Sequence, residues 1–404
     1  MSRTDIARRS GLSKPTVSLA LTRLVAAGLA RQTGKASGGK GPSANLYELN
    51  PGSGWVVGID VGRRWVRAAV ADITGGIVVR RDERARARSS RALVAQTGDI
   101  AHRVAADAGI AWSAVTAATV GSPGVLVPSS GQLHRAHNLP GWGSHGVVAA
   151  ISERLGTVVR FENDVNLAAL GERSRGLGRD VSDFVLLWVG TGVGLGIVIG
   201  GELYRGGGGA AGEIAYLPIG DGDPHDRATR RRGQLEEAAA ASGIVAQAKL
   251  LGVRPPFTPT AIFAAARRGD PAAHEVVEAE ARRLALAIAV VAPILDPQLV
   301  ILGGGIARNN ADLLLEPLRR ELHALSPFAP RLAVSELGEE AVLEGAVATA
   351  LATAQDRLFS RHEDLDRLRS RRLDQTTLAG VPPARLIATP ADYGPGAPYP
   401  DVHV

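Results

Sequence analysis

Apolar residues in the first 27 positions recur with the period of a helix, in two short stretches separated by a turn. Residues 4–10 predict a helix whose Ile6 and Ala7 face inward, and Gly11 supplies the turn because glycine tolerates positive φ. A second helix is predicted from an N-cap at Ser13, with Pro15 in its first turn, to an end at Gly28. The positions that we expect to face its core are Val17, Ala20, Leu21, Leu24 and Val25. This pattern predicts a helix-turn-helix.

The segment after this pair favours a wing. Residues 29–33 and 44–49 alternate like two strands, and the loop between them is glycine-rich and basic. Such a loop can contact phosphates without demanding one base sequence. Winged-helix domains usually carry a further helix before the pair, so we expect either a start upstream or a poorly packed head. The residues left for DNA are Lys14, Thr16, Ser18 and Arg23 on the second helix and Lys35 and Lys40 in the wing.

Further along, one apolar pattern occurs twice. Residues 55–62 and 65–72 predict two strands around an acidic-glycine turn, and residues 184–189 and 195–199 predict two strands around Gly190-Thr191-Gly192-Val193-Gly194. The repetition predicts a duplicated α/β body of two lobes with a ligand cleft between them. Glycines in such turns let backbone N–H groups approach a phosphate, although a glycine-rich hairpin is more often structural.

The carboxyl-terminal part changes character. A helix is predicted to run to about Phe359, and the charged, then proline- and glycine-rich residues 360–404 predict a tail that is disordered beyond about 375. The longest uninterrupted apolar run, residues 284–295, contains Pro293 and is shorter than the roughly 18 residues that a membrane span needs. The amino terminus has no hydrophobic signal core. We therefore expect a soluble, cytoplasmic protein that does not contact a membrane.

Composition and charge sharpen this interpretation. The chain has 404 residues, of which 45% are hydrophobic, so it can bury two or three ordinary cores, and the absence of cysteine excludes disulfides and thiolate metal sites. Residues 1–50 carry eight Lys or Arg and two acidic residues, and they account for the whole net charge of +6. A basic head on a neutral body indicates a polyanion contact confined to the head. A solvated basic arm, or a winged helix used for protein contacts, is the alternative.

Seven short motifs follow one another along the chain: Gly58-Ile59-Asp60-Val61-Gly62, Gly121-Ser122-Pro123-Gly124, Asn138-Leu139-Pro140-Gly141-Trp142, Glu162-Asn163-Asp164-Val165-Asn166, Gly190-Thr191-Gly192-Val193-Gly194-Leu195-Gly196, Gly212-Glu213-Ile214 and Leu302-Gly303-Gly304-Gly305. In this order they resemble the ROK family over roughly residues 54–350. That family groups sugar-responsive repressors, uncharacterised reading frames and sugar kinases on an actin-like, ribonuclease-H-like fold, and a winged helix-turn-helix ahead of it is similar to the repressor branch. The predicted domains are thus the head (1–50), a two-lobed ROK domain (54–350, with its cleft near 160–240) and the tail (360–404).

The resemblance implies a sugar site. In the family's kinases the last residue of the Glu-Asn-Asp motif, here Asp164, is the general base, and a carboxylate at that place can orient a sugar even without phosphoryl transfer. It also implies sugar contacts from Asn138, Asn163, Glu213 and Glu236. Alternatively, Asn163 caps a helix that begins near Val165, and the two roles are compatible.

Two departures from the family pattern are informative. The usual zinc site needs a histidine and three cysteines, but Tyr216 takes the histidine position and residues 227–236 hold no cysteine, so we expect no zinc. His225 is nearby, and we expect it to be exposed to solvent. On a predicted Gly212–Leu217 strand, the Tyr216 hydroxyl either bonds the sugar or the ring merely fills space.

The second departure concerns nucleotide. Arg63-Arg64 stand where the kinases have a small residue facing the phosphates, and a bulky pair there obstructs the turn, although arginine can bind phosphate. We therefore interpret the nucleotide positions as vestigial and expect neither bound ATP nor kinase activity. These positions are Asp60, Gly62, Gly190, Thr191 and Gly192.

The leading hypothesis is a sugar-responsive, DNA-binding transcriptional regulator, a repressor of carbohydrate-utilisation genes. Its partners would be operator DNA, a sugar or sugar phosphate effector, and a second copy in a homodimer or a dimer of dimers. The alternatives are an ATP-dependent sugar kinase with an appended DNA-binding head, and a sensor of phosphorylation state or of a protein partner that binds no sugar.

Overall fold

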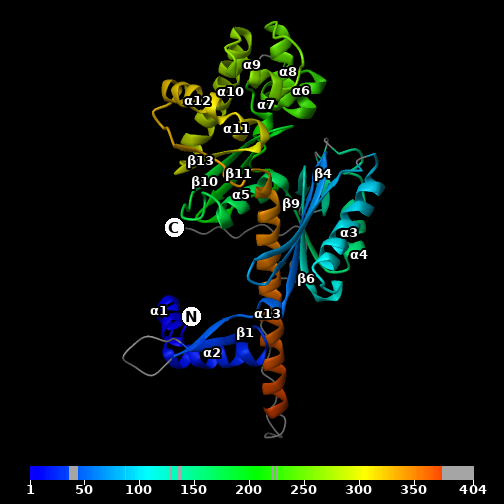
Figure 1. Cartoon of the computed structure of the whole chain (residues 1–404), viewed down its shortest axis with the longest axis vertical. Helices are drawn as coiled ribbons and strands as arrows, with labels where there is room; N and C mark the ends of the chain where they lie inside the picture. The colour runs from blue at the N-terminus through cyan, green and yellow to red at the C-terminus, as the bar shows by residue number, and fades with distance from the viewer. Residues whose placement is uncertain are drawn as a thin grey trace, which may run out of the picture. The chain divides into compact units, whose positions relative to one another are not determined.

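The structure is a computed structural model that describes residues 1–35, 44–86, 88–127, 130–134, 136, 139–220, 222–223 and 225–374; for residue 228 and residues 359–374 it describes the backbone alone. By its internal contacts the chain divides into two units, Met1–Asp356 and Arg357–Val404. The first unit contains the head and both lobes of the body. Figure 1 labels their helices and strands.

The head has the predicted helices and strands. Helix α1 (Arg3–Ser10) ends at Gly11 with φ +70°, and α2 (Lys14–Ala26) begins after Ser13, whose side chain accepts a hydrogen bond from the Thr16 N–H. Strands β1 (Ala30–Lys35) and β2 (Asn45–Leu49) pair antiparallel. The winged helix-turn-helix is thereby confirmed, and its small core consists of Ala7, Val17, Leu21 and Tyr47.

The predicted core face of α2 is partly wrong. Val17 and Leu21 are buried, but Ala20 is exposed and Val25 is 40% exposed. The core of the head is so narrow that two side chains of α2 cover it, which leaves the rest of the apolar stripe facing outward.

The first lobe is built on a five-stranded sheet in the order β5-β4-β3-β6-β9. Its central strand β3 pairs antiparallel with β4 and parallel with β6. Helices α3 and α4 lie on one face, and side chains such as Leu93 and Ile151 complete its core (Figure 1). The bounds are β3 (Trp55–Val61), β4 (Trp65–Asp72), β5 (Ile77–Arg84), α3 (Ser90–Asp107), β6 (Val115–Ser122), α4 (Val147–Leu155) and β9 (Val158–Asn163); a short hairpin, β7 (Val125–Val127) and β8 (Gln132–His134), lies beside them.

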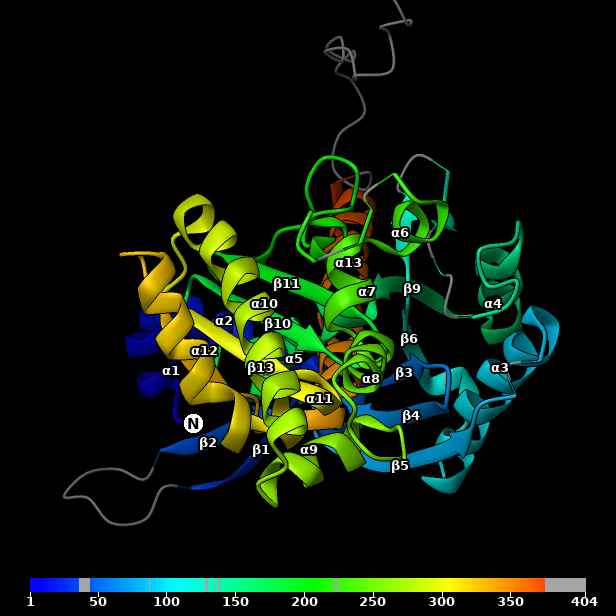
Figure 2. The same cartoon turned by 90° about the horizontal axis from the view of Figure 1, so that it is seen from above.

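The second lobe repeats this topology. Its sheet has the order β12-β11-β10-β13-β14, and its central strand β10 pairs antiparallel with β11 and parallel with β13. Helices α10 and α12 lie side by side over this sheet in Figure 2. The duplicated, two-lobed α/β body is therefore confirmed. The bounds are β10 (Phe184–Val189), β11 (Val193–Ile199), β12 (Glu202–Leu203), α6 (Arg227–Arg232), α7 (Gln234–Ala239), α8 (Ala241–Leu250), α9 (Pro259–Arg267), α10 (Pro271–Leu295), β13 (Leu299–Gly303), α11 (Gly304–Asn309), α12 (Ala311–Leu325) and β14 (Arg331–Val334).

Two helices, α5 (Asp164–Arg175) and α13 (Ala341–Asp374), cross at very close range. A Cβ added at Gly345 would lie 1.8 Å from the Leu167 carbonyl oxygen, so only glycine fits at this crossing. Val347 of α13 also packs against Gly58 of β3. The close crossing holds the start of α5 in a fixed position, and α5 begins with Asp164.

Two predictions about local structure are wrong. The predicted Gly212–Leu217 strand is instead a bend followed by a single 3-10 turn, η3 (Ile214–Tyr216), because Gly212 has φ +87°. Helix α13 continues past Phe359 to Asp374, since residues 360–374 contain neither glycine nor proline and mix both signs of charge. Residues 375–404, which include the predicted disordered tail, lie outside the described part of the chain. Within the described part, no helix combines the length and the apolar composition that crossing a membrane requires.

Candidate functional site

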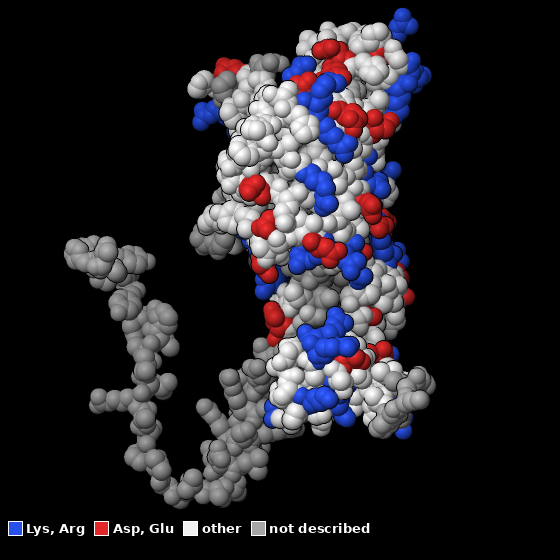
Figure 3. All heavy atoms as spheres, turned by 90° about the vertical axis from the view of Figure 1, so that its left-hand side faces the viewer, with Lys and Arg blue, Asp and Glu red and all other residues white. Residues whose placement is uncertain are grey.

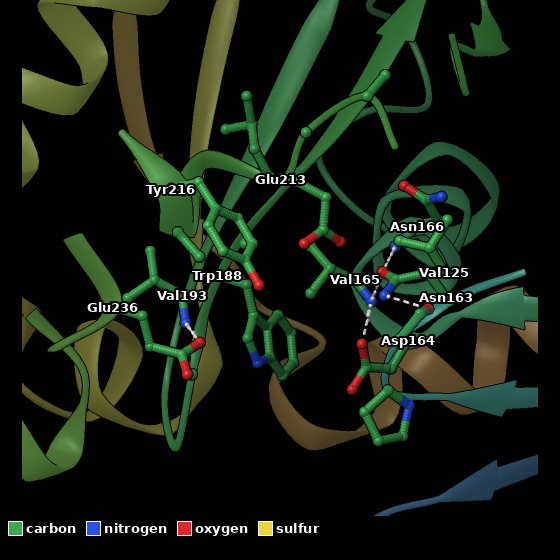
Figure 4. A pocket seen from close by; sticks show the side chains of 18 of the residues that line it. Val125, Asn163, Asp164, Val165, Asn166, Trp188, Val193, Glu213, Tyr216 and Glu236 are labelled. Carbon is green, nitrogen blue, oxygen red and sulfur yellow. Dashed lines mark hydrogen bonds between the residues drawn. The ribbon is translucent and has the colours of Figure 1, made fainter. Parts of the chain in front are cut away.

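A cavity of about 130 Å³ lies between the start of α5, the β10–β11 hairpin and the segment that holds η3 and α7. Five of the six residues predicted to bind sugar line it (Figure 4). They are Asn163, Asp164, Glu213, Tyr216 and Glu236. The sixth, Asn138, lies outside the described residues. The grouping brings carboxylate, amide and phenol groups from distant parts of the sequence to one cavity; their role in sugar binding stays a prediction.

The first wall of the cavity is the N-terminus of α5. Asn163 is the N-cap, and its side-chain oxygen accepts from the N–H groups of Val165 (2.9 Å) and Asn166 (3.2 Å), while its amide donates to the Gly124 carbonyl (3.1 Å). The capping interpretation is thus confirmed. Because capping uses the Asn163 oxygen, the residue acts on the cavity chiefly by fixing where the helix starts.

Asp164 is the most perturbed acid of the cavity. One of its oxygens accepts from the Val165 N–H at 2.9 Å, which favours the charged form. Burial, and then the negative charges of Asp60 and Glu213, act in the opposite direction and raise the pKa of Asp164 to about 7. Near neutral pH this carboxyl therefore exists in both protonation states, so it can accept a hydrogen bond from a hydroxyl or donate one to it.

The opposite wall is fixed by a glycine. At Gly212 an added Cβ would lie 1.8 Å from the Leu195 carbonyl oxygen, and the Gly212 carbonyl accepts from the Leu195 N–H at 3.0 Å. This contact holds the 212–216 segment against β11 and presents Glu213 and Tyr216 to the cavity. The Tyr216 hydroxyl donates to the Arg231 carbonyl at 3.1 Å.

The third wall comes from α7. Glu236 accepts from the Val193 N–H of the β10–β11 hairpin at 3.2 Å, and burial raises its pKa although Arg232 opposes the shift. Arg232, which also lines the cavity, donates to Glu236 (3.4 Å) and to the Ser242 hydroxyl (3.2 Å). The bond from Val193 joins the glycine-rich hairpin to α7, and the bonds of Arg232 join α6 to α7 and α8.

Trp188 and Arg232 are among the lining side chains of this cavity that the sequence did not predict as site residues. The alternation of β10 could have found Trp188, because alternate residues of a strand point to one face and Trp188 lies two residues before Gly190, where the glycine-rich turn begins. Arg232 lies within residues 227–236, whose sequence gives no local signal that an arginine there lines the cavity. The indole of Trp188 offers a flat apolar face of the kind that packs on the C–H surface of a sugar (Figure 4).

The predicted nucleotide positions fall into two groups. Thr191 and Gly192 line the same cavity as the sugar-site candidates, whereas Asp60, Gly62 and Gly190 are not among its lining residues. A second cavity of about 480 Å³ lies over Gly304 and Gly305, and it shares Trp188 with the first. The indole thus borders both cavities.

Asp60 is held by an arginine. Arg67 of β4 contacts the buried Asp60 at 3.0 Å and reaches Glu339, next to the start of α13, at 2.6 Å. A guanidinium therefore occupies one side of the Asp60 carboxylate, one of the positions interpreted as vestigial for nucleotide. Arg63 and Arg64 are exposed in the β3–β4 turn.

No group of three or more His, Cys, Asp or Glu side chains that could hold a metal ion occurs among the described residues. His225 is exposed. The chemistry of the segment facing Tyr216 does not fit zinc, because residues 227–232 offer arginine, threonine and alanine but no soft ligand.

The residues predicted to bind DNA lie on the surface of the head. Lys14, Thr16 and Arg23 are exposed on α2 and Ser18 is half-buried, while Lys35 is exposed at the end of β1 and Lys40 lies outside the described residues. Both acids of the head are already paired with arginines, Asp5 with Arg8 and Glu48 with Arg31. On the face drawn in Figure 3, acidic and basic side chains of the body are interspersed. The excess positive charge is thus confined to the head.

Together, the two repeated lobes and the winged helix-turn-helix define an actin-like protein with a DNA-binding head, and a polar cavity lies at the start of α5. The ROK family model matches residues 56–353, and the IclR helix-turn-helix domain model matches residues 1–34. The chain belongs to the ROK family.

Both repressors and kinases are similar to this chain. The xylose repressor of Caldicellulosiruptor bescii is 27% identical, with 87% of this chain and 92% of that protein covered. Among solved structures, a ROK family transcriptional regulator that is a homologue of the E. coli MLC protein superposes with a TM-score of 0.73 at 22% identity, covering 90% of this chain and 94% of that one. The ROK hexokinase of Thermus thermophilus is 30% identical with a TM-score of 0.63, and the match covers 75% of this chain and 99% of that one.

Proposed function

We propose that this protein is a sugar-responsive, DNA-binding transcriptional regulator, a repressor of carbohydrate-utilisation genes whose ROK domain binds a sugar effector and alters operator affinity. The observation that carries the proposal is the presence in one chain of a basic winged helix-turn-helix and a body whose cavity gathers Asp164, Glu213 and Glu236. The likeness to a xylose repressor over 87% of this chain supports it.

The effector class follows from the chemistry of the cavity. Carboxylates and amides accept hydrogen bonds from neighbouring hydroxyls in pairs, and an aromatic face covers the C–H side of a ring, which together suit a sugar or a sugar phosphate. Thermal-shift screening of hexoses, pentoses, amino sugars and their phosphates tests this, since a specific ligand stabilises the native state by mass action. A ligand found in this way must then change the affinity for DNA.

We propose no kinase activity, on two observations. The contact between Arg67 and Asp60 neutralises the acid that would face nucleotide. Trp188 also stands at the border between the cavity of Asp164 and the cavity over Gly304 and Gly305. For a nucleotide in the cavity over Gly304 and Gly305, the phosphoryl group would have to pass this border to reach a sugar hydroxyl beside Asp164.

The second candidate is a sugar kinase with an appended DNA-binding head, and the retained Asp164 together with the likeness to the hexokinase favours it. A coupled ATP-consumption assay over the same sugars distinguishes the two. Turnover with any sugar would overturn the regulator-only proposal.

Two partners complete the proposal. A repressor that reads operator DNA acts in the cytoplasm and uses two copies of the head, so we expect a homodimer or a dimer of dimers. Light scattering of the full chain, with and without DNA, measures this assembly.

A further inference from the structure

Helix α2 presents a large apolar side chain to the outside of the head. Val17 and Leu21 form its buried side, at 2% and 6% exposure, whereas Leu19 is 57% exposed. Leu19 lies two residues from each of them, or about 200° around the helix, so it points away from the core. The most outward position of the predicted recognition helix is therefore a leucine.

Two hydroxyl groups near Leu19, those of Thr16 and Thr22, are already engaged. The Thr16 hydroxyl hydrogen-bonds the Ser13 hydroxyl at 2.7 Å, and the Thr22 hydroxyl donates to the Ser18 carbonyl at 2.9 Å. Each bond stays within α2 or its cap. This side of the helix thus offers apolar contact more readily than hydroxyl hydrogen bonds.

The charges around Leu19 indicate which surface it meets. Lys14 and Arg23 stand five residues before it and four residues after it, and residues 1–50 carry the whole net charge of the chain. Such surroundings repel a basic protein surface and attract phosphates. In the major groove the apolar group that lies between flanking phosphates is the C5-methyl of thymine, which distinguishes T·A from the other base pairs.

We propose that Leu19 is a base-reading residue that contacts the C5-methyl group of a thymine in the operator; this inference rests on the proposed DNA-binding function. The lysines and arginines of the head bind the DNA backbone without discriminating between sequences. The Leu19 contact adds this discrimination. A second copy of the chain, docked through Leu19, is the competing occupant.

The test uses DNA that lacks only the methyl group. Duplexes retained by the full-length protein are selected from a random library, and the tightest is remade with deoxyuridine replacing one thymine at a time. We expect one replacement per half-site to weaken binding of the parent protein by about fourfold, the equivalent of one buried methyl group. The Leu19→Ala variant should bind the unmodified duplex more weakly and show no further loss at that position.

Val25→Ala is the matched control, because Val25 is an exposed apolar residue of the same helix, 40% exposed, on a different side. At each deoxyuridine position, Val25→Ala should lose the same affinity as the parent protein. The far-ultraviolet circular dichroism spectra of both variants should also match that of the parent protein. If no deoxyuridine weakens the parent, or if Leu19→Ala keeps the parent's pattern, the inference is wrong although DNA binding stands. A lowered oligomeric state of Leu19→Ala with an unchanged pattern would assign Leu19 to self-association. If the library yields no retained duplex, the proposed function fails and the inference fails with it.

Discussion

The hydroxyl of Tyr216 donates a hydrogen bond of 3.1 Å to the backbone carbonyl of Arg231. This bond ties one wall of the cavity to α6, whose last residue, Arg232, also lines the cavity. Sequence reasoning considered the hydroxyl as a sugar ligand and the ring as a space filler. The structure shows a tether between two segments, on a ring that borders the same cavity.

Tyr216→Phe removes this tether and keeps the ring. We expect the free energy of unfolding to fall by about 0.5–1.5 kcal/mol, the usual contribution of one neutral hydrogen bond. Since Arg232 then loses an anchor, sugar affinity should fall about two- to tenfold while operator binding without sugar stays unchanged. Thermal unfolding and sugar titration measure both effects. If the free energy of unfolding and the sugar affinity are both unchanged, the hydroxyl contributes to neither. A sugar response that a chelator alters, in the parent protein or in the variant, would reveal a metal.

Asp164→Asn tests the sugar site itself. The change preserves size and an oxygen that can accept from the Val165 N–H, so the cap of α5 should persist. We expect the sugar response of operator binding to be abolished or sharply weakened, with sugar-free operator binding intact. Asp180→Asn, at an exposed position outside the cavity lining, is the control and should respond like the parent protein. Loss of both functions in Asp164→Asn would indicate a folding role.

The elements that the sequence predicts correctly are those that local signals mark. Ser13 and Pro15 fix the start of α2, and paired apolar runs around glycine-rich turns fix β3–β4 and β10–β11. The contacts that give the site its electrostatics were not predictable in this way. Arg67 meets Glu339 across 272 positions of sequence, and the bend at Gly212 follows from an approach to Leu195 that no local pattern encodes.

The pH dependence of the protein should report on Asp164. Its pKa in the folded protein, about 7, lies above the ordinary 3.8, so protonation stabilises the folded state. This contribution is fully present below about 3.8 and is lost as the pH rises through about 7. The melting temperature of the parent protein should therefore fall relative to that of Asp164→Asn between about pH 5 and 8. If the two melting curves shift in parallel over this range, Asp164 does not titrate there.

Sugar affinity should show the opposite trend. A charged carboxylate accepts hydroxyl hydrogen bonds more strongly than a neutral acid, so affinity in the parent protein should rise as the pH increases from about 6 to 8. Calorimetric titration over this range measures the change. A flat profile would mean that the sugar does not bond Asp164 in its charged form.

The wing should contribute to DNA affinity without contributing to sequence preference. Replacing Lys35 and Lys40 together by glutamine removes two positive charges, and each phosphate contact contributes about 0.9 to the slope of log affinity against log salt. If both contact phosphates, binding to every duplex should weaken and the slope should flatten by about two. Lys249→Gln, a change in the body of the protein, is the control. An unchanged slope in the double variant would show that the wing does not touch phosphates.

Trp188 should report sugar binding by its fluorescence. Its indole lines the cavity of Asp164 and borders the cavity over Gly304 and Gly305, whereas Trp142 is fully buried in the first lobe. A sugar that packs on the indole excludes water from it, so the emission of the parent protein should change in proportion to sugar bound. Trp188→Phe keeps an aromatic face and should lose this emission change, while calorimetry shows a sugar affinity within about threefold of the parent value.

The same titration, repeated with ATP, tests whether nucleotide binding affects the sugar cavity. If the indole closes the border between the two cavities, ATP added alone should leave the sugar affinity of the parent protein unchanged. An emission change that persists in Trp188→Phe would show that another tryptophan reports sugar binding. A sugar affinity that depends on ATP would show that nucleotide reaches the site despite Trp188 and the contact between Arg67 and Asp60.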